Sequence, residues 1–236
     1  MWTPRFQRKE EGYRGRWAHG TFHHPNYKVN YNKMAANGAG SMSAEAFAEE
    51  VGYASTSAAA VAAVQRAVEA PAVFFYGALL SALHAYTLRP HAPKLGESLE
   101  NWIGVVELLT FKTLRDVDAS AAGVKAIVVQ HPVITEKLRL LTLLTLCSQQ
   151  NMTTGGICMS YETIGPAVGR KGSVEVQKVV LAAVQHKLCV ARLNEQTATV
   201  RISAYESRAV DASEVAALKE RVVGWIRYAK QHLRES

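Results

Sequence analysis

The sequence predicts a mainly α-helical chain: a helical-repeat bundle, then a winged-helix subdomain with a small β-hairpin, then a C-terminal amphipathic helix. Apolar stripes with the helical period recur over residues 43–134. Residues 135–205 follow the order helix, helix, turn, helix, hairpin, which is that of a winged helix. Residues 211–235 carry one further apolar stripe, which predicts a separate terminal helix.

Composition limits the class of protein. Of 27 Lys and Arg, seven lie in residues 1–40 with two acidic residues, so most of the net charge of +7 belongs to this end. Residues 1–42 show no helix or strand period and are expected to form a flexible basic extension. No apolar run approaches the roughly 18 residues of a membrane span, and no secretory signal is apparent, so we expect a protein of the cytoplasm and nucleus.

The front half reads as a stack of short antiparallel helices. Alanine-padded stripes favour close helix packing but contribute little burial per residue. We expect helices over 43–53, 57–69, 71–86 and 98–114. Residues 115–133 stay ambiguous, because the run 124–129 has strand composition but lies among helices.

The back half is more distinctive. We expect helices over 134–150, 160–169 and 173–188, the second interrupted near its Gly-Pro pair. A hairpin then spans 189–203, in which Val200 and Ile202 alternate with polar residues at the strand period. Its outer edge would leave backbone groups free to pair with another chain.

The terminal helix, 211–235, has an apolar stripe at bundle spacing, made of Val215, Leu218, Val222, Trp225 and Leu233. The hairpin is the last element of the winged helix, so the apolar stripe of the terminal helix is not needed for that subdomain and requires another surface to cover it. Two possibilities stay open: the helix packs back on its own domain, or it joins a bundle with helices of other chains.

Several segments resemble the PCI-domain family of the proteasome lid, the COP-nine signalosome and translation initiation factor three. They are APAVFFYGALL (70–80), the helix around 107–111, KLRLLTLLTLCS (137–148) and AAVQHKLCVARLNEQTATVRI (182–202). Within the family they look most like the subunit-seven branch of the signalosome. The resemblance spans about 70–205. It implies a PCI domain made of the helical-repeat part, 43–134, and the winged-helix part, 135–205.

The resemblance further implies a non-catalytic scaffold subunit. Its complex removes a ubiquitin-like modifier from cullins and so regulates cullin–RING ubiquitin ligases. The implied partners are other PCI subunits, which meet the winged-helix edge and the terminal helix. The residues expected at these two surfaces are Arg192, Val200, Ile202, Val215, Leu218, Val222, Trp225 and Leu233.

Two alternatives remain. The same fold could serve initiation factor three or the proteasome lid. The chain could instead bind nucleic acid through its basic extension and a modest basic set, Arg170, Lys171, Arg192 and Arg201. The third winged-helix helix argues against this, because its expected outward residues are mixed in charge: Glu175, Gln177, Lys178, Gln185 and His186.

Catalytic and metal-binding patterns are not found. The chain has no phosphate-binding glycine loop, no nucleophile elbow and no HExxH. Cys147, Cys158 and Cys189 are too widely spaced to suggest a zinc site or a disulfide framework. His84 and His131 read as helix-surface histidines without a carboxylate at helical spacing. We therefore expect no enzyme activity, no metal and no cofactor.

Overall fold

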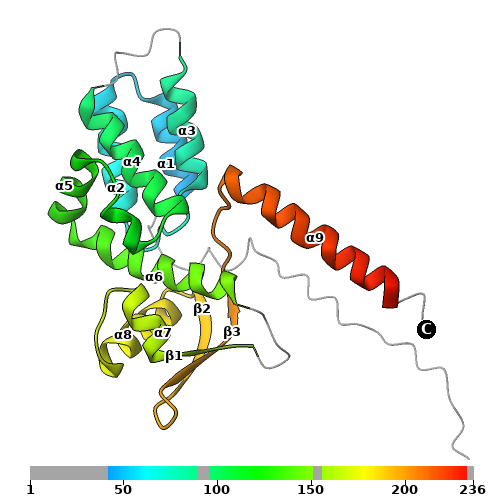
Figure 1. The fold of residues 1–236 in the computed structure, drawn as a ribbon. Helices are drawn as coiled ribbons and strands as arrows, with labels where there is room; N and C mark the ends of the chain where they lie inside the picture. Colours follow the sequence, from blue (N-terminus) through cyan, green and yellow to red (C-terminus); the bar gives the residue numbers. More distant parts are fainter. Residues whose placement is uncertain (1–41, 90–95, 151–155, 233–236) are drawn as a thin grey trace, which may run out of the picture. The chain divides into compact units, whose positions relative to one another are not determined.

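The computed structural model describes residues 42–89, 96–150 and 156–232. It confirms the predicted fold class: a helical bundle is followed by a small three-stranded antiparallel sheet with helices, and then by a C-terminal helix (Figure 1). Residues 1–41 of the expected extension lie outside the described residues. Within the described ranges, no helix is long and apolar enough to cross a membrane.

The described part of the front half contains five helices and one turn of 3-10 helix, Leu114–Val117. The helices are α1 (Ala44–Tyr53), α2 (Ser57–Glu69), α3 (Gly77–Thr87), α4 (Glu97–Phe111) and α5 (Ala122–Gln130). Hydroxyl caps begin the first two: Ser43 accepts from the amide of Ala46, and Thr56 from that of Ala59. The buried alanines of α2 let it pack against α4 at short range.

Two expectations for this half need correction. The helix predicted over 71–86 begins only at Gly77, and residues 71–76 form a turn and an irregular segment. The carbonyl of Val73 accepts a hydrogen bond from the side chain of Lys137, so it is not used in a helical backbone bond. The ambiguous run 124–129 is helical and belongs to α5, so its β-branched composition was overridden by packing against α4 and α6.

The back half begins with α6 (Pro132–Gln149), which lies between the bundle and the sheet in Figure 1. The other elements are β1 (Ile157–Ser160), α7 (Tyr161–Ala167), α8 (Ser173–Gln185), β2 (Cys189–Asn194) and β3 (Thr199–Tyr205). The sheet order is β1-β3-β2, with both pairs antiparallel. The strand β1 was not predicted. The helix expected over 160–169 is shorter, because Ser160 belongs to β1 and α7 ends at Ala167.

The sheet has one buried and one exposed face. Val200 and Ile202 of β3 pair with Met159 and Ile157 of β1, and all four side chains are buried. Helix α8 covers the core with Val176, Val179, Val180 and Ala183. Val184, next along the helix, is 36% exposed. At about 100° per residue it lies at the edge of the buried stripe.

The last helix, α9 (Ala212–His232), follows β3 through a short linker, 206–211. One contiguous cluster of buried side chains runs from Phe47 of α1 to Ile202 of β3. No residue of α9 belongs to this cluster. The bundle and the winged helix therefore share a core, and the described side chains of α9 stay outside it.

Candidate functional site

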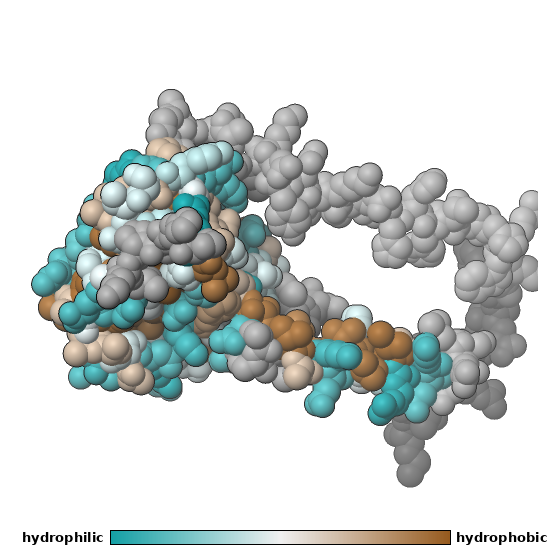
Figure 2. Space-filling model, turned by 90° about the horizontal axis from the view of Figure 1, so that it is seen from above, coloured by the Kyte–Doolittle hydropathy of each residue, from teal (hydrophilic) through white to brown (hydrophobic). Residues whose placement is uncertain are grey.

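The apolar stripe of α9 is the first candidate surface. Val215, Leu218, Val222 and Trp225 occupy positions i, i+3, i+7 and i+10, and their exposed fractions range from 43% to 79%. Val223 and Ile226 beside them are also exposed. In Figure 2, hydrophobic (brown) and hydrophilic (teal) side chains are interleaved along the described part of α9. Leu233, also predicted for this stripe, lies outside the described residues.

This exposure bears on the two possibilities for the terminal helix. Had α9 packed back on its own domain, its stripe would be buried against the core. The described side chains of the stripe are instead open to solvent. A run of apolar side chains at 3-4 spacing is the surface that a second helix can cover by knobs-into-holes packing. Among the described residues, therefore, the stripe is not buried against the domain, and a bundle with another helix remains possible.

The linker before α9 is fixed by Arg208. Its guanidinium donates to the carbonyl of Leu109 at 2.9 Å, at the end of α4, and to the hydroxyl of Thr145 on α6 at 2.7 Å. Upstream, the amide of Glu206 donates to the carbonyl of Leu188. These bonds tie the linker to the bundle, to α6 and to the winged helix, so they determine where α9 leaves the domain.

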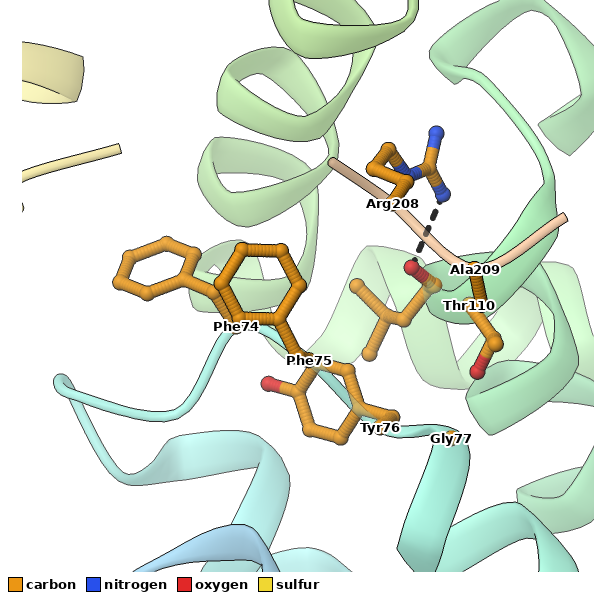
Figure 3. Close-up of a pocket in the computed structure, with 8 residues that line it drawn as sticks. Phe74, Phe75, Tyr76, Gly77, Thr110, Arg208 and Ala209 are labelled. Atoms are coloured by element: carbon orange, nitrogen blue, oxygen red, sulfur yellow. Dashed lines mark hydrogen bonds between the residues drawn. The ribbon is translucent and has the colours of Figure 1, made fainter. Parts of the chain in front are cut away.

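A shallow pocket lies where Arg208 meets the bundle. Figure 3 shows Phe74, Phe75 and Tyr76 on one side, with Arg208 reaching from the linker to α4 on the other. The space open to water-sized molecules is about 20 Å³, which is room for about one water. A substrate pocket is usually at least about ten times larger. We therefore assign this pocket to the attachment of the linker and not to a ligand.

The second candidate surface is the outer edge of the sheet. Strand β2 pairs with β3 on one side, and no described strand pairs with its other side. A register shift between Val190 and Ala191 bends its first part. Arg192 points to the exposed face of the sheet, as predicted for an interface residue. It lies directly opposite Arg201 of β3.

Two residues predicted for this interface are corrected by the structure. Val200 and Ile202 are both 0% exposed, so their side chains cannot touch a partner while the domain is folded. Their alternation with polar residues was read correctly as a strand, but the apolar face of that strand is the face that makes the domain's own core. What β3 offers on the outside is Arg201, next to Cys158 of β1.

A buried lysine is a feature that the sequence analysis missed. Lys137 of α6 is 3% exposed, and its nitrogen lies 2.6–2.8 Å from four acceptors: the carbonyls of Val68, Ala70 and Val73 and the phenol of Tyr76. The three N–H groups of an ammonium are therefore shared among these four oxygens. Burial lowers the pKa of Lys137 to about 7. The only hint in the sequence is a lysine inside a largely apolar helix.

The outward face of α8 is poorly suited to nucleic acid. Val174 and Leu181, seven residues apart, are both exposed there. Glu175 pairs with Lys178 at 2.6 Å. Arg170, one of the basic residues considered for DNA contact, lies 3.0 Å from Glu136 and 3.8 Å from Glu175. Its positive charge is thus largely neutralised inside the protein, which weakens the predicted basic set.

The histidines acquire carboxylate neighbours that the sequence spacing did not show. His84 lies 3.5 Å from Glu107, and His131 lies 3.2 Å from Glu69, in each case from another helix. Both pairs are partly exposed to solvent. Across the described ranges, no three His, Cys, Asp or Glu side chains come together as a metal site would require.

His186, at the end of α8, packs its ring 4.8 Å from that of Phe74. Partial burial, followed by the nearby charge of Lys137, lowers the pKa of His186. The residue therefore contacts the segment before α3 while it stays exposed at the end of α8, as the sequence predicts.

Comparison with known proteins adds no assignment. No protein-family model matches the chain, and no curated protein matches it significantly. The functional argument therefore rests on the residues and on the two surfaces described above, the stripe of α9 and the edge of β2.

Proposed function

We propose that this chain is a non-catalytic scaffold subunit of a multi-subunit PCI assembly in the cytoplasm and nucleus. Its segments resemble most closely the subunit-seven branch of the COP-nine signalosome. In that role it would help to organise the complex that removes a ubiquitin-like modifier from cullins. The single observation that carries the proposal is the uncovered apolar stripe of α9, with Val222 and Trp225 near its centre.

The stripe is large enough to matter energetically. Fully burying one Val, Leu or aromatic side chain contributes roughly 1.5–3 kcal/mol. Six such side chains of α9 are exposed: Val215, Leu218, Val222, Val223, Trp225 and Ile226. Covering most of them in a bundle would supply several kcal/mol toward assembly, after the costs of association.

The domain beneath α9 has the features expected of a rigid support. Its bundle and winged helix share a core, and Arg208 fixes the exit of the linker through the carbonyl of Leu109. The described residues offer two attachment surfaces, and the pocket beside Arg208 is too small for a substrate. This arrangement favours holding neighbours in place over chemistry.

The test places two charges in the stripe. In Val222→Asp/Trp225→Asp, two carboxylates would have to enter an apolar bundle, so we expect the tagged chain to lose its PCI partners in cell extracts. The matched control, Arg227→Asp/Gln231→Asp, puts the same groups on the opposite face of α9 and should retain them. Circular dichroism should show the same helix content for both variants.

The identity of the partners decides between assemblies. Other PCI subunits recovered with a signalosome metallopeptidase subunit would support the proposal as stated. Recovery of ribosomal or proteasomal proteins would keep the scaffold role and move it to initiation factor three or the proteasome lid. If the double aspartate variant of Val222 and Trp225 retains every partner of the wild type, α9 is not the assembly helix and the proposal fails.

A further inference from the structure

Two arginines lie side by side on the exposed face of the sheet. Arg192 of β2 is directly opposite Arg201 of β3, and both are exposed. Directly opposed side chains in an antiparallel pair have Cβ atoms about 4.5–5.5 Å apart, so like charges there repel each other. The two like charges lie at the edge of the sheet, where a bound anion would reduce their repulsion.

Three other arginines of the domain are paired with acids. Arg66 contacts Glu50, and Arg139 and Arg170 both contact Glu136. Within the part of the chain that the structure describes, neither Arg192 nor Arg201 has a carboxylate within 4.0 Å. The neighbouring outward residues are neutral: Cys158, Ser160, Thr199 and Ser203. The pair therefore forms an uncompensated positive patch.

The patch adjoins the open edge of the sheet. A strand added outside β2 would continue the row that now runs from Arg192 through Arg201 to Cys158. Side chains alternate between the two faces of a strand, so every second residue of the added strand would lie over the exposed face. The residue opposite Arg192 would be within reach of its guanidinium, which binds carboxylates through paired hydrogen bonds.

We propose that the strand which adds to β2 is an acidic one: an extended segment of a protein partner with Asp or Glu at alternate positions, one of them opposite Arg192. The backbone of β2 provides the pairing, and the arginines select the sequence and register of the added strand. This inference rests on the proposed scaffold function and specifies the chemistry of the partner at the sheet edge.

A nucleic acid would need a broader positive surface than the structure provides. The outward face of α8 presents Val174 and Leu181, and Arg170 is already neutralised by two glutamates. Phosphate binding generally depends on several unpaired Lys and Arg acting together. The open backbone edge also has no use in binding a nucleic acid, whereas a peptide strand uses both the edge and the arginines.

The test uses synthetic peptides as probes on the full chain. A peptide of alternating Thr and Glu, its Thr and Lys counterpart, and a single-stranded oligo-thymidine are titrated while backbone amide NMR signals are recorded. We expect the acidic peptide alone to shift the amides of β2. Arg192→Glu/Arg201→Glu should weaken its binding at least about tenfold, while the control Arg115→Glu, which reverses another exposed charge, should not.

Raising salt from about 0.1 M to about 1 M should weaken binding of the acidic peptide to the wild type, because the Debye length falls to about 3 Å. This measurement decides the matter even if the double variant fails to fold. Equal binding of both peptides, or shifts outside β2 only, would overturn the inference. Shifts at β2 caused by oligo-thymidine and not by the acidic peptide would assign the patch to nucleic acid instead.

The Val222→Asp/Trp225→Asp variant separates this inference from the proposed function. It leaves the sheet untouched and should bind the acidic peptide as the wild type does. Loss of partners in that variant together with failure of the acidic peptide would leave the scaffold role standing and refute the acidic strand. If the variant retains its partners and the acidic peptide binds, the acidic strand stands and the role of α9 in the proposed scaffold function is refuted.

Discussion

The ammonium nitrogen of Lys137 lies 2.8 Å from the phenol oxygen of Tyr76, and that phenol donates its own hydrogen to the carbonyl of Val73. Three backbone carbonyls also lie within hydrogen-bond distance of this nitrogen, two of them those of Val68 and Ala70 at the end of α2, so its N–H groups are shared among four acceptors. The sequence predicts a regular helix from residue 71, but residues 73–76 are irregular and bond to the buried Lys137 of α6 instead. The following predictions begin from this cluster.

Replacing Lys137 by Met should destabilise the domain by about 2–4 kcal/mol, since each buried acceptor left without a donor costs roughly 1–3 kcal/mol. The side chains are similar in length, so the change removes the charge and the donors more than the packing. Urea unfolding measures the effect. The control Lys178→Met, on the surface of α8, should cost no more than about 0.5 kcal/mol; equal losses would show that the buried cluster adds nothing.

Stability should rise with pH above neutrality because of the same residue. The pKa of Lys137 falls from 10.5 to about 7 on burial. Between these values the unfolded chain binds more protons than the folded one, so the free energy of unfolding increases with pH, by at most about 1.4 kcal/mol per pH unit. Below about pH 7 both states are protonated and this contribution is flat.

Urea unfolding between pH 7.5 and pH 9 suits this measurement. The lower limit avoids His186, whose pKa is lowered from 6.5. The pKa values of Cys147 and Cys189 are raised from 9.0, so near pH 9 their ionisation in the unfolded chain lowers the slope equally in the wild type and in the variant, and the difference between the two slopes reports on Lys137. Lys137→Met should lose the slope that the wild type shows. The same slope in both proteins would mean that the carbonyl cluster keeps the ammonium charged throughout this range.

The three cysteines should differ sharply in reactivity. Cys158 is exposed on the outer face of the sheet, whereas Cys147 and Cys189 are buried. Burial raises the pKa of Cys147 to about 12 and that of Cys189 to about 11, which leaves little thiolate to react. A thiol reagent with a chromophore should therefore label one site quickly in the native chain and all three in urea. Loss of the fast phase in Cys158→Ser would confirm the assignment.

Arg208→Met should loosen the linker before α9 without unfolding the domain. The substitution removes the bonds to Leu109 and Thr145, and bonds to a charged group contribute about 1.5–3 kcal/mol each. Amides of the linker, 206–211, should exchange hydrogen at least about tenfold faster, with those of α6 unchanged. Arg115→Met is the control. Unchanged exchange in the linker would show that other contacts hold it.

Two glycine substitutions should have opposite signs. A Cβ on Gly104 of α4 would lie 2.7 Å from a methyl carbon of Val124 on α5, so Gly104→Ala must push these helices apart, at a cost of about 1–3 kcal/mol. A Cβ on Gly52 of α1 meets nothing within 4 Å, and Gly52→Ala should stabilise by up to about 1 kcal/mol. Thermal unfolding of both variants measures the contrast.

The helices of this chain were largely predictable because each carries its own stripe, as α8 does with Val176 and Val180. The strand β1 was missed because four residues are too few to show a period, and its pairing partner, such as Ile202 for Ile157, is distant in the sequence. The segment before α3 was misread because its conformation depends on Lys137, some 60 residues away, through a bond that no local pattern records.

The candidate surfaces were predictable to different degrees. The stripe of α9 was found because exposure and helical period coincide at Val222 and Trp225. The edge of the sheet was located, but the wrong face was assigned to Val200, since alternation alone gives two faces without saying which one is inside. The opposition of Arg192 and Arg201 needs the register of the hairpin, which is fixed only when the turn and the bulge are known.

Helix α6 has a consequence for how this chain can be divided. Three of its side chains form hydrogen bonds to other parts of the chain. Lys137 bonds to the segment before α3, Thr142 accepts from the amide of Leu114, and Thr145 accepts from Arg208 of the linker. The boundary expected between residues 134 and 135 falls inside this helix. Cutting there would strand polar groups on both fragments and split a single core. The winged helix is therefore no transplantable module, and the chain should melt in one cooperative step.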